Sequence, residues 1–285
     1  MEHAKLTKYK DMTPVKEDRW FKVYKLPNDI YAIFEPYHFQ EVACFLVIGS
    51  EKALLFDTGM GVGDVKAMVE SLTDLPLTVV NSHSHFDHIG GDWQFDEVYM
   101  NGKLNIETWG GSWQTLPRDD DNLSAEAFQD FPGGLEAFWM NPNDLVTREP
   151  KKILHVGEGD IFNLGNRSFR VIETPGHSDD GIMLIDDEHK IMLTGDTIYP
   201  AAIYAHLGES NLTVYTEVVH KLADQYSDYL MYCSHNNPVW EGKALLEIAA
   251  AFDEVVEKRK AEEAAGIQHE ITRYEFDGAD FAIMS

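Results

Sequence analysis

The feature that most constrains this chain is the segment NSHSHFDHIGGD at residues 81–92, which places three histidines and one aspartate within six positions. It continues directly from LTVV, an apolar run typical of a β-strand. Alternate residues of an extended segment point the same way, so His83 and His85 can hold one ion. Asp87 and His88 fall beyond the bend and face elsewhere. The spacing therefore predicts two neighbouring metal sites.

Apolar runs rich in β-branched and aromatic residues recur along the chain and predict two similar halves, each with strands followed by helix. In the first half the expected strands are 20–26, 30–36, 42–49, 52–59 and 77–83, with a helix over 63–74. The second half has further short strands, a helix over 211–226 and a last strand over 229–235. An apolar stripe predicts that a helix over 244–264 covers a sheet. Asp277-Gly278 then predicts a hairpin, either an edge pair or a dimer element.

Four strand ends carry a metal-ligand residue just past an apolar run, in NSHSHFDH, ETPGHSDD, MLTGDTIY and YCSHNNP. Functional groups of mixed sheets lie on the loops that leave the strand ends, so we expect these four loops to converge. His177 would then complete the first site and His235 the second. Asp196 offers a carboxylate that can bridge two ions about 3.5–4 Å apart.

Composition limits the partners. The chain has 285 residues and a formal charge of −26, which disfavours nucleic acid and anionic membranes. We expect a single domain over 1–285, with an aromatic-rich insert at about 105–150 and a C-terminal helix plus hairpin at about 244–285. Only Cys44 and Cys233 are present, and no export signal or long apolar run occurs, so a cytoplasmic location is expected.

Together these motifs resemble the metallo-β-lactamase-fold hydrolases, whose signature His-X-His-X-Asp-His is matched in full by residues 83–88. The resemblance runs from about residue 20 to 240 and implies an α/β fold, a four-layer αβ/βα sandwich with metals at one edge of two sheets. It implies that His177 is a ligand of site one, that His235 is a ligand of site two and that Asp196 bridges the two metals. Asp57, in LFDTG, would accept the second ring N–H of a metal-bound imidazole.

The resemblance implies a hydrolase with two Zn²⁺ ions, Fe or Mn being alternatives. A hydroxide held between the metals would attack an acyl carbon, and Asp87 would hold the second ion and shuttle the proton. Tyr199 follows Asp196 by three residues, as a tyrosine does in acyl-homoserine lactonases and an acyl-CoA thioesterase branch. Its phenol would stabilise the oxyanion. We therefore expect a small acyl substrate: a carboxylic ester, a lactone or a thioester.

Other functions stay open at this point. A β-lactam hydrolase has the same fold, and a mononuclear iron sulfur dioxygenase of that fold uses two histidines and an aspartate. Glutamate replaces His85 in the flavodiiron oxidoreductases, which argues against oxygen reduction. A non-catalytic metal-stabilised protein is disfavoured, because a structural zinc site leaves no carboxylate to bridge.

Aromatic residues beside the metal edge are candidates for the substrate pocket. Two lie on the loop after Asp196, namely Tyr204 and His206; four lie in the insert, namely Trp109, Trp113, Phe138 and Trp139. The insert predicts a pocket wall or lid. A small helical subdomain and the contact of a homodimer are the alternatives.

Overall fold

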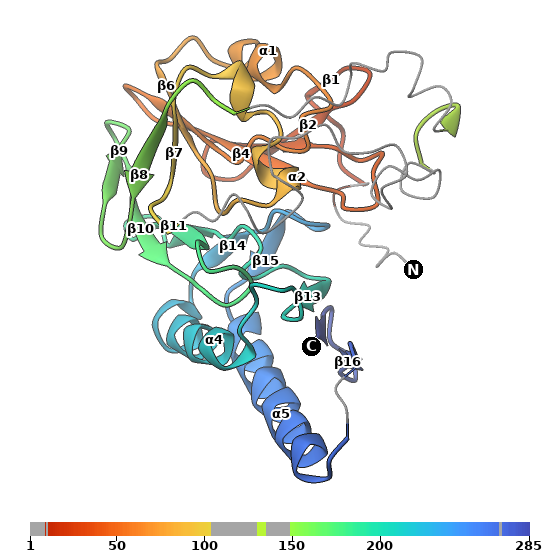
Figure 1. The fold of residues 1–285 in the computed structure, drawn as a ribbon. Helices are drawn as coiled ribbons and strands as arrows, with labels where there is room; N and C mark the ends of the chain where they lie inside the picture. The colour runs from red at the N-terminus through yellow and green to blue at the C-terminus, as the bar shows by residue number, and fades with distance from the viewer. Residues whose placement is uncertain (1–8, 10, 104–129, 135–148, 268–269) are drawn as a thin grey trace.

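The computed structural model describes residues 9, 11–103, 130–134, 149–267 and 270–285 (Figure 1). Its first sheet has eight strands in the order β1 to β8. They are β1 (Lys16–Glu17), β2 (Lys22–Leu26), β3 (Ile30–Phe34), β4 (Ala43–Ile48), β5 (Ala53–Phe56), β6 (Leu77–Val80), β7 (Val98–Asn101) and β8 (Ile153–Val156). Strands β1 to β5 pair antiparallel, and β5 to β8 run parallel.

The second sheet has six strands in the order β15-β14-β12-β11-β10-β9. They are β9 (Ile161–Asn163), β10 (Ser168–Glu173), β11 (Ile182–Asp186), β12 (Ile191–Leu193), β14 (Leu230–Tyr232) and β15 (Val239–Glu241). A third sheet joins β13 (Ala202–Tyr204), β17 (Ala282–Met284) and β16 (Arg273–Glu275). Strands β16 and β17 form the predicted C-terminal hairpin, and β17 pairs with β13 of the same chain.

Helices form where apolar residues recur at helical spacing, and a polar side chain caps the first turn of two of them. The described helices are α1 (Val65–Glu70), α2 (Phe86–Ile89), α4 (Leu212–Tyr226) and α5 (Ala244–Ala264), with a 3-10 turn at Asp92–Gln94. Asp64 caps α1 and Asn211 caps α4, each accepting a backbone N–H three residues on. The predicted helices at 211–226 and 244–264 are confirmed. Within the described ranges, no helix has the length and apolarity needed to cross a bilayer.

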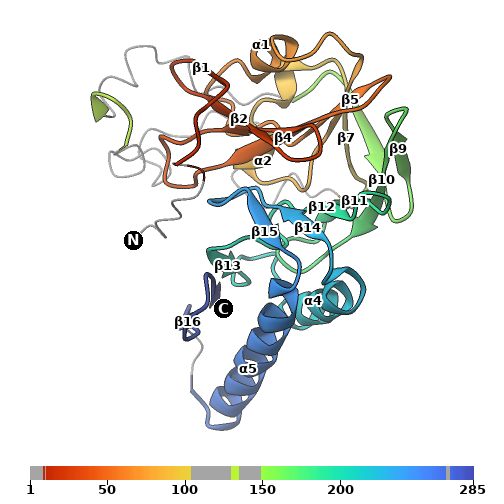
Figure 2. The ribbon, with the colours of Figure 1, turned by 180° about the vertical axis from the view of Figure 1, so that it is seen from behind.

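Three apolar clusters give the protein its layers. Aromatic residues of the central one come from both sheets, among them Phe34, Phe45 and Phe56 opposite Phe169 and Tyr232. The outer face of the first sheet packs against α1 and α2, and that of the second against α4 and α5. Both views show this order of helix, sheet, sheet and helix (Figures 1 and 2), which confirms the predicted four-layer sandwich.

Strand directions bring the functional loops to one edge. Strands β5 and β6 are parallel, as are β12 and β14. Strand β10 runs the same way as β12, because each is antiparallel to β11. Two backbone hydrogen bonds join the sheets at this edge: Ile182 N donates to Ser82 O at 2.8 Å, and Ala43 N to Ser234 O at 2.7 Å. The carboxyl ends of strands from both halves therefore meet.

Candidate metal centre

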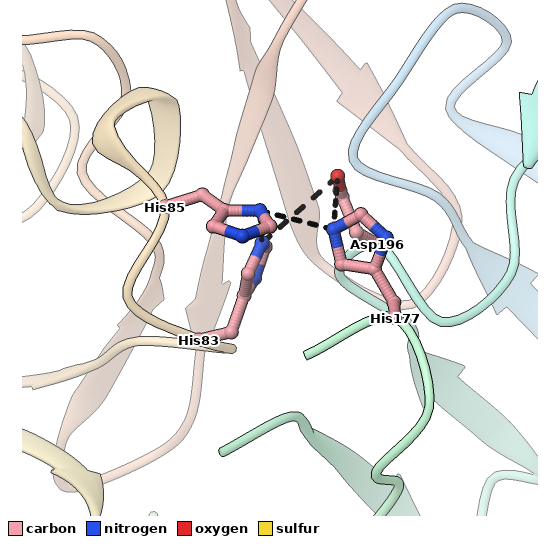
Figure 3. Close-up of side chains that lie close together, drawn as sticks. All are labelled: His83, His85, His177 and Asp196. Carbon is pink, nitrogen blue, oxygen red and sulfur yellow. Dashed lines mark hydrogen bonds and ion pairs between the residues drawn. The ribbon is translucent and has the colours of Figure 1, made fainter. Parts of the chain in front are cut away.

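The first group of ligand atoms comes from three loops (Figure 3). His85 Nδ1 lies 2.8 Å from His83 Nε2 and 3.0 Å from His177 Nε2. Asp196 Oδ2 lies 3.5 Å from His177 Nε2 and 4.0 Å from His83 Nε2. Four atoms bound tetrahedrally to zinc at 2.0–2.1 Å would be roughly 3.3 Å apart. The observed spacing therefore fits one cation, and all four side chains point toward a common centre.

The second group contains Asp87, His88 and His235. Asp87 Oδ2 lies 3.8 Å from His88 Nε2 and 3.7 Å from His235 Nε2. Asp196 Oδ1 lies 3.1 Å from His88 Nε2 and 2.9 Å from His235 Nε2. The two carboxylate oxygens of Asp196 thus face different groups, which is the arrangement of a bridging ligand.

Local backbone geometry explains how one short segment serves both groups. His85 is extended, with φ −69° and ψ 148°, and α2 begins at the next residue. This start of a helix turns Asp87 and His88 away from the direction of His83 and His85, as the spacing predicts. Across the edge, Gly195 has φ 51°, and a Cβ there would lie 2.5 Å from Ser82 Cβ. Glycine therefore lets the Asp196 loop approach the histidine segment.

Each imidazole has a partner for the ring nitrogen that faces away from its group. Such partners fix ring orientation and tautomer. The pairs are His83 Nδ1 with Ser82 Oγ (2.9 Å), His85 Nε2 with Glu209 Oε1 (2.6 Å), His88 Nδ1 with Asp57 Oδ2 (2.9 Å), His177 Nδ1 with Tyr204 O (2.9 Å) and His235 Nδ1 with Gln40 O (2.7 Å). The imidazoles are thereby held before any cation binds.

Asp57 lies where the sequence analysis expected it. It is fully buried at the end of β5, and its φ of 67° is in the left-handed region that aspartate tolerates. Besides His88, its carboxylate accepts from Ser82 N at 2.6 Å and from Ser82 Oγ at 3.0 Å. One carboxylate thus links β5, the end of β6 and a ligand of the second group.

The electrostatics of the two groups differ. Burial lowers the pKa of His83 well below its usual range and that of His177 to about 4, which keeps both rings neutral. Burial also lowers the pKa of His88, but the charges of Asp196, Asp87 and Asp57 outweigh it and hold the pKa well above normal. Because metals bind the neutral imidazole, His83 and His177 are already in the coordinating form, whereas His88 releases a proton when it binds.

Unpaired buried atoms give a further test of whether a cation fits. Among the described residues, His88 Nε2 and Asp196 Oδ1 are buried without an aligned hydrogen bond, although they lie only 3.1 Å apart. A buried polar atom left unpaired costs about 1–3 kcal/mol. A cation in the second group would satisfy both atoms, and Asp196 Oδ2 faces the first group, so the residues present fit a pair of divalent metal ions.

The structure places Tyr199 beside the second group, with its ring 5.2 Å from that of His235. Its hydroxyl donates to Ala202 O at 2.8 Å and accepts from Tyr204 N at 3.2 Å. Contact with a substrate carbonyl, the role predicted for this phenol, would require the bond to Ala202 to break.

Tyr204 and His206 follow on the same loop, with ring centres 5.1 Å apart. Tyr204 is half-buried, and burial together with the charges of Asp196 and Asp87 raises the pKa of its phenol. Burial lowers the pKa of His206. Their predicted contact with substrate stays a prediction.

The insert is described only in part. Trp109, Trp113, Phe138 and Trp139 lie outside the described residues. Phe131 is described and buried; its ring lies 6.0 Å from Trp20 and 5.5 Å from Tyr37. This part of the insert packs on the outer face of the first sheet.

Sequence reasoning missed Glu209. Burial opposes ionisation of its carboxyl, but the hydrogen bond with His85 outweighs burial and lowers the pKa. The two residues are 124 positions apart, and HLGESN has no spacing that signals a partner for a histidine. Only the fold brings them together.

Comparison with known proteins agrees with this geometry. The family model described as the metallo-beta-lactamase superfamily matches residues 39–235. This chain belongs to that superfamily. It is 28% identical over 221 residues to the acyl-coenzyme A thioesterase MBLAC2 of Bos taurus, covering 72% of this chain and 76% of that protein. It is 24% identical over 170 residues to the hydroxyacylglutathione hydrolase GloC of Haemophilus influenzae, covering 56% of this chain and 68% of that protein.

Solved structures share the metallo-β-lactamase fold. A beta-lactamase domain protein from Burkholderia ambifaria superposes with a TM-score of 0.63 at 19% identity, covering 89% of this chain and 78% of that one. Family and fold together make the chain a metallo-hydrolase of the superfamily.

Proposed function

We propose that the enzyme hydrolyses an ester-type acyl bond at a centre of two zinc ions, and that a thioester is its principal substrate class. The observation that carries the two-metal centre is the position of Asp196. One of its oxygens lies 2.9 Å from a nitrogen of the second group and the other 3.5 Å from a nitrogen of the first. A single iron with two histidines and an aspartate, as in a sulfur dioxygenase, would leave four of these seven ligand residues unused.

The residues assign the two sites. His83, His85 and His177 would hold one cation, and Asp87, His88 and His235 the other, with Asp196 shared. When bound, such a pair of cations activates a water for attack and stabilises the charge that develops on the acyl oxygen.

The chain's own groups have separate tasks in the proposed reaction. Asp87 borders the second site through Oδ2, where a carboxylate can accept the proton of the attacking water. The side chain of Tyr204 is partly exposed, and burial with the charges of Asp196 and Asp87 raises the pKa of its phenol. The phenol therefore stays neutral and can donate toward a carbonyl oxygen. Tyr199 would share that role only after releasing Ala202.

The substrate class rests on the names of relatives. Those relatives are named for hydrolysis of acyl derivatives of coenzyme A and of glutathione, both of which are thiols. Thioesters are therefore the members of the predicted ester, lactone and thioester set that we place first. The proposed substrate is a small acyl-bearing molecule.

A substrate panel with metal analysis tests this proposal. The purified enzyme would be assayed with an acyl-CoA, an acylglutathione, an acyl-homoserine lactone, an aryl ester and a chromogenic cephalosporin, and its zinc and iron counted by elemental analysis. We expect two metals per chain and the highest kcat/KM for a thioester. Preference for the cephalosporin, or one iron per chain with oxygen uptake, would overturn the proposal.

A further inference from the structure

We propose that Glu209 is a positioning residue of the first metal site: it fixes the tautomer and orientation of His85 and thereby strengthens the binding of the cation there. The inference concerns metal binding and holds whatever substrate the enzyme takes. It rests on a contact of 2.6 Å between Glu209 Oε1 and His85 Nε2.

His85 differs from the other four histidines of the centre. It presents Nδ1 to its group, whereas His83, His88, His177 and His235 present Nε2. An imidazole can bind a metal only through a nitrogen that carries no proton. The proton of His85 must therefore lie on Nε2, the atom that faces Glu209.

A carboxylate enforces this choice, because an ionised carboxylate only accepts hydrogen bonds. With Glu209 Oε1 against Nε2, the proton is held there and the lone pair of Nδ1 is left for the cation. A charged acceptor also makes the imidazole a stronger donor to the metal. His177, another ligand of this site, has a backbone carbonyl as its acceptor. That acceptor is neutral, so it does not strengthen the imidazole as a donor to the metal in the same way.

The position of Glu209 is built into the fold. Its side chain is 9% exposed and that of His85 is 8% exposed, so little water competes for the contact. Ser210 N donates to Leu207 O at 2.9 Å, which closes a turn around Glu209. Ser210 Oγ then donates to His177 O at 2.7 Å. One turn thus supports two ligands of the same cation.

Each metal group has one imidazole backed by a carboxylate. Asp57 supports His88 in the second group, from the end of β5 in the first half of the chain. Glu209 supports His85 in the first group, from the half of the chain that follows it. Glu209 therefore reaches its histidine across the interface between the two halves of the chain.

The test compares Glu209→Gln and Glu209→Ala with Asp253→Asn. The control removes the charge of another carboxylate–histidine contact, Asp253 with His220 at 2.9 Å, which is exposed between α4 and α5. Metal-free proteins would be titrated with Zn²⁺ against a chromophoric chelator, and with Co²⁺ while the visible absorption bands are recorded.

We expect Glu209→Ala to weaken one of the two zinc equivalents by about 10–100-fold and to change the Co²⁺ bands of that equivalent, with the other unaltered. Glu209→Gln keeps an acceptor oxygen and should recover part of the affinity. Asp253→Asn should match the wild type. Wild-type affinity and Co²⁺ bands in both Glu209 variants would refute the proposal. If the alanine variant fails to fold, the result for Glu209→Gln decides the test.

Discussion

Replacing Asp57 with asparagine should remove one metal from the centre and leave the fold in place. Asparagine tolerates the left-handed backbone at this position, so the substitution adds little strain. Its oxygen can still accept from Ser82 N, as Asp57 Oδ1 does. The amide NH₂ then stands where Asp57 Oδ2 lies 2.9 Å from His88 Nδ1, so that two donors face each other.

A metal binds the neutral ring of His88, which has one proton, on Nδ1, and the conflict is relieved when that proton moves to Nε2. Nε2 is the atom that points to the second site, 3.1 Å from Asp196 Oδ1, and a proton there blocks coordination. Loss of the outer partner of a metal-bound histidine typically costs 10–100-fold in affinity, or about 1.4–2.8 kcal/mol. The lost charge-assisted hydrogen bond should also lower the unfolding free energy of the metal-free protein by about 2 kcal/mol.

Elemental analysis after dialysis against a weak chelator measures the outcome. The variant should retain one metal per chain where the wild type retains two, and the weakened equivalent should be the one that Glu209→Ala leaves unaltered. Asp253→Asn, the same chemical change at an exposed histidine contact, is the control. Two metals bound with wild-type dissociation constants in Asp57→Asn would refute the reasoning about the tautomer.

Three further changes test other parts of the structure. Asp196→Asn replaces one bridging oxygen with an amide, so one metal should be lost and kcat/KM should fall by more than about 100-fold, measured with the best substrate of the panel. Burial raises the pKa of Asp92 to about 8, so the folded protein keeps a proton that the unfolded chain releases near pH 4, and stability should decrease between about pH 4 and 8. Urea unfolding of Asp92→Asn across that range should lack this decrease, and equal slopes would contradict the assignment. Gly176→Ala would bring a Cβ to 2.5 Å from Tyr215 Cβ at φ 144°, so the unfolding free energy should fall by about 1–3 kcal/mol, with weaker metal binding at the adjacent His177.

The sequence by itself determined the features that depend on neighbouring residues. Alternation along an extended segment sets the directions of His83 and His85, and the helix that begins at Phe86 turns His88 away from them. The regular recurrence of apolar residues along α4 and α5 predicted those helices, because this pattern also depends only on residues close together in the chain. Local geometry also made the four strand ends recognisable as sources of ligands.

The tertiary structure alone decided which atoms meet. The packing of two sheets places one oxygen of Asp196 at each metal group and brings Glu209 to His85 across 124 residues. It also commits the Tyr199 hydroxyl to Ala202, although the resemblance to the lactonases implies a contact with substrate. A periodic pattern sets the direction in which a side chain leaves its own backbone, whereas a distance between remote loops depends on how the intervening layers pack.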